Sequence, residues 1–296
     1  MYEPLTVGEE RFQLLGPLAF PQSIFIESHR IDACMDYAAR NGLAGIAISA
    51  LTGFKLLDLS FLVRFPSVEH LTILHADMLD ISGITTLKNL KYLQMNGTPK
   101  QSVDLANFPL LRELRVQWWP GLRFLGALTS LRTLMLSHYK PSSDDLTALP
   151  AIPQLEDLSL VQSRKLVLSG IARFPQIKKL AVYYLPALTD LSPLSFFADG
   201  VMESLEFGNC PKITNHNEVR VVRSLKRLAF NQCGEISSLA FLNELTELES
   251  FSFFGTNIVD GDLTPCLRLK FAGFLNKRHY SHRSAEFPPV GGTMSS

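Results

Sequence analysis

A short pattern of hydrophobic and polar residues recurs along most of the chain. In its clearest copy, Leu90-Lys-Tyr-Leu93-Gln-Met95, a hydrophobic residue is followed three positions later by a second, and two positions after that by a third. The middle residues of eleven copies are separated by ten steps of about 22 residues. These middle residues are Ile46, Leu71, Leu93, Leu114, Leu134, Leu158, Leu180, Leu205, Leu228, Phe251 and Leu269.

The alternation at the second and third hydrophobic positions predicts a short β-strand with one apolar face. One such strand cannot bury that face alone, so neighbouring copies are expected to stack. A period in the twenties with the pattern Leu-x-x-Leu-x-Leu is the signature of a leucine-rich repeat. The sequence therefore predicts an α/β leucine-rich-repeat solenoid of about eleven repeats. A curved parallel sheet would form its concave side, with short 3-10 or α turns on the convex side.

Prolines mark the predicted strand boundaries. Four of them stand two positions before the first hydrophobic residue of a copy, where a residue without an N–H donor suits a bend better than a strand. The hydrophobic residue before each proline is expected to pack beneath the convex side. The four are Pro66, Pro109, Pro153 and Pro175.

Several segments carry a family resemblance. Thr189-Asp-Leu-Ser-Pro-Leu194 and Ile236-Ser-Ser-Leu-Ala-Phe-Leu242 resemble short bacterial leucine-rich repeats of the internalin type. Asn209-Cys-Pro-Lys-Ile-Thr214 and Asn231-Gln-Cys-Gly-Glu-Ile236 resemble cysteine-containing repeats. The resemblance covers about residues 43–275 and implies the fold but no particular partner. Internalins are secreted, whereas this sequence opens without a secretory signal, so it is more similar to an intracellular bacterial relative.

The ends of the predicted solenoid need caps, because the outermost repeats would otherwise expose apolar faces. An edge strand is expected at 23–27, followed by a helix with Ser28 as its N-cap and Asn41-Gly42 as its end. The apolar stripe of this helix is Ile31, Met35 and Ala38. The predicted boundaries are 1–42 for the N-terminal cap, 43–273 for the repeats, 274–285 for the C-terminal cap and 286–296 for a flexible tail.

Composition narrows the class of partner. The 49 leucines agree with a repeat protein, and the 28 basic residues balance the 28 acidic ones. No overall charge therefore favours nucleic acid or an anionic membrane. No run of 18 apolar residues occurs, as a membrane-spanning helix would need. We expect a cytoplasmic monomer that binds a protein and neither nucleic acid nor a membrane.

The four cysteines are too few for a disulfide framework. Cys210 and Cys233 lie one repeat apart, which predicts stacked positions in a ladder. Cys34 and Cys266 are expected to be small core residues.

Candidate catalytic chemistry is sparse. No nucleotide-binding or hydrolase motif occurs, so we expect neither catalysis nor a cofactor nor a metal. His279 and His282 are three residues apart and, with Asp260 and Asp262, leave a metal-dependent enzyme at the C-terminal cap as a remote alternative.

An aromatic rim beside the concave face is the predicted partner site. Both tryptophans of the chain and several tyrosines fall just after predicted strands, and Trp, Tyr and Arg are enriched at binding hot spots. The alternative is that Trp119 and Tyr184 turn inward and fill space beneath loops. The predicted site residues are Trp118, Trp119, His138, Tyr139, Tyr183, Tyr184, Arg115, Lys179, Tyr92 and Arg227.

The predicted function is non-catalytic binding of a protein partner across the concave face. The small size and the expected bacterial cytosol fit an inhibitor or immunity-type protein, and fit an adaptor equally well. The alternative is a secreted effector without a cleaved signal that binds a host protein.

Overall fold

The computed structural model describes residues 12–15, 22–75 and 77–287. The chain divides into two compact units, Met1–Leu136 and Ser137–Ser296. We call them the N-terminal and the C-terminal unit and describe each by itself.

The N-terminal unit is built on a sheet whose strands follow one another in chain order. Strands β1 and β2 pair in antiparallel fashion, and the pairs from β2 to β7 are parallel. Strand β9 (Thr133–Ser137) contains the division between the units, and β6 (Val103–Asp104) pairs with β8 (Leu122–Arg123) in a small second sheet. The other strands are β1 (Leu14–Leu15), β2 (Ser23–Phe25), β3 (Gly45–Ile48), β4 (His70–Ile73), β5 (Tyr92–Met95) and β7 (Glu113–Gln117).

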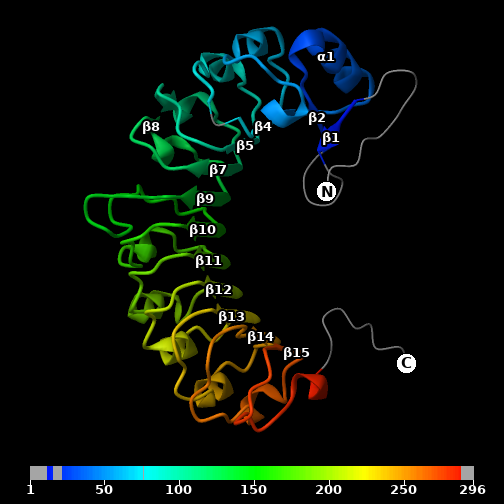
Figure 1. The fold of residues 1–296 in the computed structure, drawn as a ribbon. Helices are drawn as coiled ribbons and strands as arrows, with labels where there is room; N and C mark the ends of the chain where they lie inside the picture. The colour runs from blue at the N-terminus through cyan, green and yellow to red at the C-terminus, as the bar shows by residue number, and fades with distance from the viewer. Residues whose placement is uncertain (1–11, 16–21, 76, 288–296) are drawn as a thin grey trace. The chain divides into compact units, whose positions relative to one another are not determined.

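The C-terminal unit repeats the same arrangement with parallel strands in chain order (Figure 1). The register places each middle hydrophobic residue beside that of the next strand, as in Leu158 against Leu180. The strands are β10 (Asp157–Val161), β11 (Lys179–Tyr183), β12 (Ser204–Gly208), β13 (Arg227–Asn231), β14 (Ser250–Ser252) and β15 (Phe271–Gly273).

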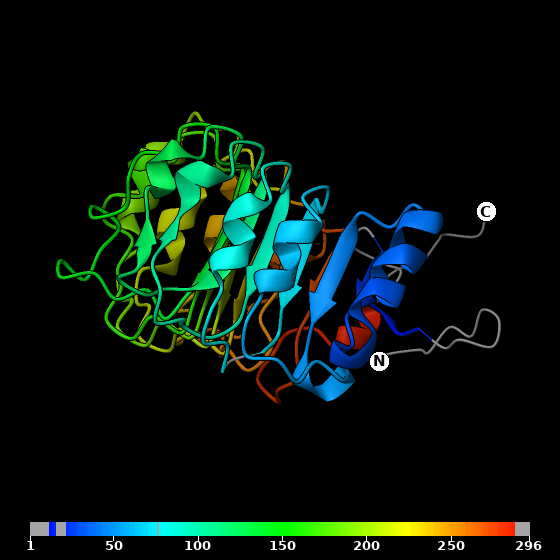
Figure 2. The same cartoon turned by 90° about the horizontal axis from the view of Figure 1, so that it is seen from above.

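Short 3-10 helices return the chain from one strand to the next and cover one side of each sheet (Figure 2). The side of the sheet away from them is called the open face below. These helices confirm the predicted short turns. They are Ala50–Thr52, Ser60–Arg64, Ser82–Thr86, Leu105–Asn107 and Leu125–Ala127 in the N-terminal unit, and Ile171–Arg173, Ser192–Phe197, His216–Val221, Ala240–Glu244, Thr264–Cys266 and Ser284–Glu286 in the C-terminal unit.

The core of each unit lies between the sheet and the 3-10 helices. The strands alternate between buried and half-exposed positions, as in β10 and β11, because successive side chains point to opposite faces. The predicted prolines lie in turns, and Phe108 and Phe174, which precede two of them, are fully buried. The leucine-rich-repeat fold is therefore confirmed in both units.

The last strand corrects one prediction. Ala272, not Leu269, pairs with Phe251 and occupies the middle hydrophobic position of β15. Leu269 is buried as well, but it precedes the strand. A small alanine in the strand and a leucine ahead of it shift the apparent pattern by three residues.

The N-terminal cap agrees with the sequence except at its start. Helix α1 (Ile31–Arg40) buries Met35 and Ala38, and Gly42 ends the helical segment with a left-handed φ of 66°. Ser28 starts a 3-10 turn, Ser28–Arg30, and is not the N-cap of α1. Its hydroxyl instead accepts hydrogen bonds from the backbone N–H groups of Lys55 and Leu56, at 2.6 and 3.2 Å.

The expected edge strand at 23–27 is β2, in which Ile24 pairs with Ile46 of β3. It is not the outermost strand, because β1 pairs along its other side. Most of the predicted tail, residues 288–296, lies outside the described residues.

Candidate partner-binding site

The predicted rim residues of the N-terminal unit are mostly covered. Trp119 is only 5% exposed, and its indole N–H donates to the carbonyl of Gln101 at 3.2 Å. Tyr92 is buried too and donates to Gln94 at 2.7 Å, and burial raises its pKa to about 12. Trp118 and Arg115 are half-buried, with Arg115 hydrogen-bonded to Glu113. Trp119 therefore turns inward, as the alternative interpretation expected.

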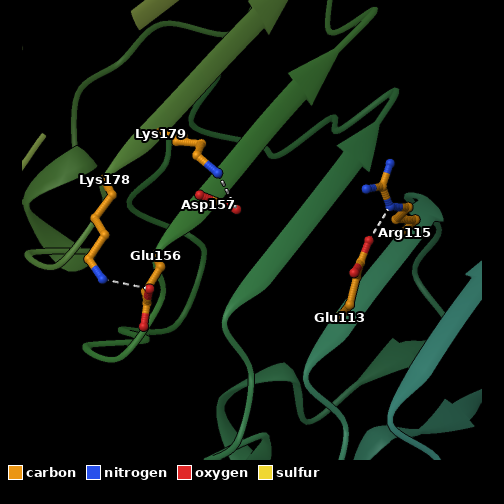
Figure 3. A network of polar contacts seen from close by, with 6 residues as sticks. All are labelled: Glu113, Arg115, Glu156, Asp157, Lys178 and Lys179. Atoms are coloured by element: carbon orange, nitrogen blue, oxygen red, sulfur yellow. Dashed lines mark hydrogen bonds and ion pairs between the residues drawn. The ribbon is translucent and has the colours of Figure 1, made fainter. Parts of the chain in front are cut away.

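The rim residues of the C-terminal unit divide into buried and exposed side chains. Tyr139 is buried, and burial raises its pKa to about 12. Tyr184 is 52% exposed and His138 is exposed, so the expectation of an inward Tyr184 is wrong. Lys179 and Arg227 are exposed on the open face, and Lys179 lies 3.6 Å from the Asp157 carboxylate (Figure 3).

Tyr183 lies on the open face of the C-terminal unit, against Gly208 of the neighbouring strand. A Cβ on Gly208 of the neighbouring strand would lie 2.5 Å from Tyr183 Cδ1, so only glycine leaves room for this ring. The Tyr183 hydroxyl donates to Glu206. Burial of the ring, together with this hydrogen bond, raises the pKa of Tyr183. The ring is therefore seated beside Gly208, with its hydroxyl bonded to Glu206.

Two further rings share a glycine at the end of the same face. A Cβ on Gly273 would lie 2.7 Å from Phe271 Cζ and 2.9 Å from Phe254 Cε2. Phe254 is 42% exposed and Phe271 half-buried, and the nearby Leu275 is exposed. The open face thus carries partly exposed aromatic rings beside Gly208 of β12 and Gly273 of β15.

The edge where the strands begin carries an alternating row of charges, here called the amino-edge ladder. Its residues directly precede β10 to β15, and each lysine pairs with the glutamate of the strand before it, at 2.7 to 2.9 Å. Hydrogen bonds from Lys226 and Lys270 lower the pKa values of Glu203 and Glu249. The ladder consists of Glu156, Lys178, Glu203, Lys226, Glu249 and Lys270, and Figure 3 shows its first pair.

The edge where the strands end is different. Directly after β9 to β13, one residue in each repeat has a positive φ between 54° and 59°, a conformation that non-glycine residues rarely adopt. The backbone N–H of each donates to a carbonyl of the next repeat at 2.7 to 2.9 Å. We call these residues the corner row: His138, Gln162, Tyr184, Asn209 and Gln232.

The cysteine ladder is confirmed as buried packing. Cys210 and Cys233 are buried free thiols, and Cys210 Sγ lies 3.5 Å from the Gly208 carbonyl oxygen. The interaction with Cys210 and burial raise the pKa of the Cys233 thiol. Cys34 and Cys266 are buried core residues, as expected.

The histidines considered for a metal site make other contacts. His279 Nε2 lies 2.9 Å from the Ile258 carbonyl oxygen, and His282 Nδ1 lies 2.8 Å from the Ser281 hydroxyl. Asp262 accepts a hydrogen bond from the backbone N–H of Thr264. Across residues 12–15, 22–75 and 77–287, the His, Cys, Asp and Glu side chains form no group of three or more that could hold a metal ion.

Glycine positions in the sequence could have indicated the corner row and the places where the aromatic rings lie. Gly97 and Gly255 stand four residues after Leu93 and Phe251, and both have positive φ. Aligning the repeats would have placed the corner row at the same position. Glycines at strand positions, such as Gly208 and Gly273, mark where a ring from the neighbouring repeat needs space.

Comparison with known proteins identifies similar chains. No protein-family model matches the sequence. A Trypanosoma equiperdum protein described as an adenylate cyclase regulatory protein is 24% identical over 199 residues, which cover 65% of this chain. The chain spans about a quarter of the length of that curated relative, 26%.

Among solved structures, an internalin of Listeria monocytogenes is 19% identical, with a TM-score of 0.49, over 79% of this chain and 75% of that one. The functional domain of Listeria monocytogenes InlJ, which includes a cysteine ladder, has a TM-score of 0.42 at 15% identity over 70% and 53%. A Leptospira interrogans leucine-rich-repeat protein has a TM-score of 0.35 at 13% identity, over 73% of each chain. In the described part of this chain, no helix has the length and apolarity needed to cross a bilayer.

Proposed function

We propose that the chain binds a protein partner through the open face of its C-terminal unit, with Tyr183, Phe254 and Phe271 as the anchoring side chains. The observation that carries the proposal is the seating of these rings on Gly208 and Gly273. A ring already seated against neighbouring residues loses little conformational freedom when a partner covers it.

The chemistry of these side chains supports the same surface. Aromatic rings contribute large buried areas to interfaces, and hot spots are enriched in Tyr and Trp. Lys179 and Arg227, predicted from the sequence, are exposed on the open face of the same unit. Solenoids bind along their extended concave surfaces, which the open face would form.

Two more specific roles are consistent with binding through this surface, and the surface fits both equally well. An inhibitor or immunity-type protein would cover the working surface of its partner. An adaptor would hold its partner while leaving that surface accessible. An activity assay of the captured partner, with and without this chain, separates the two.

The test replaces one exposed phenylalanine on each side of the C-terminal unit. Phe254→Ser removes a ring from the open face, whereas Phe196→Ser removes a 50% exposed ring from the 3-10 helix Ser192–Phe197 on the other side. In a second pair of variants, a photo-crosslinking amino acid replaces Phe254 or Phe196. Each of these proteins is incubated with native lysate and irradiated, and the crosslinked proteins are identified by mass spectrometry.

We expect one stoichiometric protein crosslinked at position 254 and absent at position 196. Its binding to the purified chain should weaken by about tenfold or more in Phe254→Ser, as for an interface hot spot. Equal capture at both positions, or unchanged binding by Phe254→Ser, would contradict the proposal. Tyr139 is unsuitable for this test, because it is buried and its loss would disturb the fold.

A further inference from the structure

A hollow of about 1020 Å³ lies beside the corner row of the C-terminal unit. All five corner-row residues line it, together with the loop segments that follow β9 and β10. The rings used in the proposed function, Tyr183, Phe254 and Phe271, are not among the residues that line it. It therefore requires its own explanation.

The hollow has a positive balance of charge. Lys140, Arg164 and Lys165 line it against one carboxylate, Asp144. Lys165 lies 3.9 Å from Asp144. Within the described part of the chain, Lys140 and Arg164 have no carboxylate at ion-pair distance, unlike the lysines of the amino-edge ladder. Two exposed cations thus remain available to an anionic ligand.

The corner row adds hydrogen-bonding groups. The side chains of Gln162, Asn209 and Gln232 form no hydrogen bond with another described residue, although each backbone N–H is bonded to the next repeat. An amide group carries both a donor and an acceptor, which matches the alternating C=O and N–H groups of a peptide backbone. The ring of Tyr184 lines the same hollow and is exposed.

The backbone conformation of the corner row indicates that these side chains have a role besides stabilising the fold. A left-handed φ is unfavourable for a non-glycine residue, whereas glycine adopts it freely. Gly97 and Gly255 occupy the same position in other repeats, so glycine is compatible with this corner. Five non-glycine side chains nevertheless line one hollow.

We infer that this hollow binds an extended acidic segment of a protein partner. Five neighbouring repeats spaced by about 4.8 Å span roughly 19 Å, which an extended peptide covers with about six residues. Carboxylates of that segment would pair with Lys140 and Arg164, and the corner-row amides would bond its backbone. The inference does not rest on the open face, and the variants of the hollow leave that face unchanged.

The experiment measures fluorescence anisotropy of labelled hexaglutamate titrated with the full chain. We expect saturable binding at low salt that weakens by about tenfold or more in Lys140→Ala/Arg164→Ala, because two charge-assisted contacts are lost. Arg223→Ala/Arg278→Ala removes the same charge from exposed positions outside the hollow and should change affinity by less than about twofold. Phe254→Ser should leave this binding unchanged.

A second variant tests the corner row without destabilising the fold. Gln162→Gly/Gln232→Gly removes two amides at positions where glycine fits the backbone, so the melting temperature should not fall. Binding of hexaglutamate should weaken by about fivefold or more, as expected for lost hydrogen bonds. A lower melting temperature with unchanged affinity would show a purely structural row and overturn this role.

Other outcomes contradict the whole inference. They are absence of saturable hexaglutamate binding, equal weakening in the charge-matched control, and binding of a six-nucleotide oligothymidylate in preference to hexaglutamate. The last result would assign the hollow to a nucleic acid. Hexalysine should not bind.

Discussion

The two edges of the sheet in the C-terminal unit carry charged and polar residues at the same repeat interval. The edges differ in whether these side chains are paired with one another. At the amino edge, glutamate and lysine alternate from strand to strand and each lysine pairs with its neighbour. At the other edge, the side chains of Gln162, Asn209 and Gln232 line a hollow and form no hydrogen bond with another described residue. Lys140 and Arg164 have no carboxylate at ion-pair distance in the described part of the chain.

The difference separates side chains that stabilise the stack from side chains available to a partner. A paired charge gains little from a ligand, because binding would first break an existing ion pair. An unpaired polar group in a hollow exchanges only water for the ligand. A row of polar residues that repeats from strand to strand does not by itself indicate a binding surface. Whether those side chains already pair with one another is the more useful observation.

The largest effect should come from the residues that hold both edges in place. Leu158 is buried in β10, between Glu156 at one edge and Gln162 at the other. Leu158→Ala should lower the free energy of unfolding by about 2–5 kcal/mol, through lost burial and the cavity that remains. Chemical denaturation of the full chain measures this change. A loss below about 1 kcal/mol would mean that the repeat core repacks around the cavity.

A buried histidine provides the next largest effect. His216 is 3% exposed, packs edge-on against Phe230, and burial lowers its pKa to about 4. The unfolded chain, with an ordinary value near 6.5, therefore takes up the proton first as the pH falls. The stability that neutral His216 contributes is fully present above about pH 6.5. It is lost as the pH falls toward 4, by about 3 kcal/mol in total.

His216→Phe should remove this decline, because phenylalanine cannot take up a proton. Unfolding curves of both proteins between pH 7 and pH 5 test it, since the lowered pKa values of Glu203 and Glu249 keep these two ladder glutamates ionised there. Parallel pH profiles for the two proteins would contradict the assignment. The result matters for the comparison because it separates acid sensitivity of the core from that of the ladder.

The repeat fold could be predicted because burial of one strand face imposes a spacing on the hydrophobic residues. The orientation of neighbouring rings could not. Trp118 and Trp119 are adjacent and equally hydrophobic, and only the loop around Gln101 decides that Trp119 turns inward. The corner row was missed for a similar reason, since its polar residues resemble ordinary loop residues until the backbone φ of each is known.

The smallest effect should come from the charges themselves, and its sign distinguishes the two edges. Lys178→Ala removes a lysine from the amino-edge ladder, where Glu156 lies 2.8 Å away, so the melting temperature should fall slightly. Lys140→Ala removes a cation without such a partner, so the melting temperature should stay the same or rise. High salt should abolish the loss in Lys178→Ala, because exposed ion pairs are screened. Equal losses in both variants at low salt would mean that Lys140 also stabilises the fold, and the distinction between a paired and an available edge would fail.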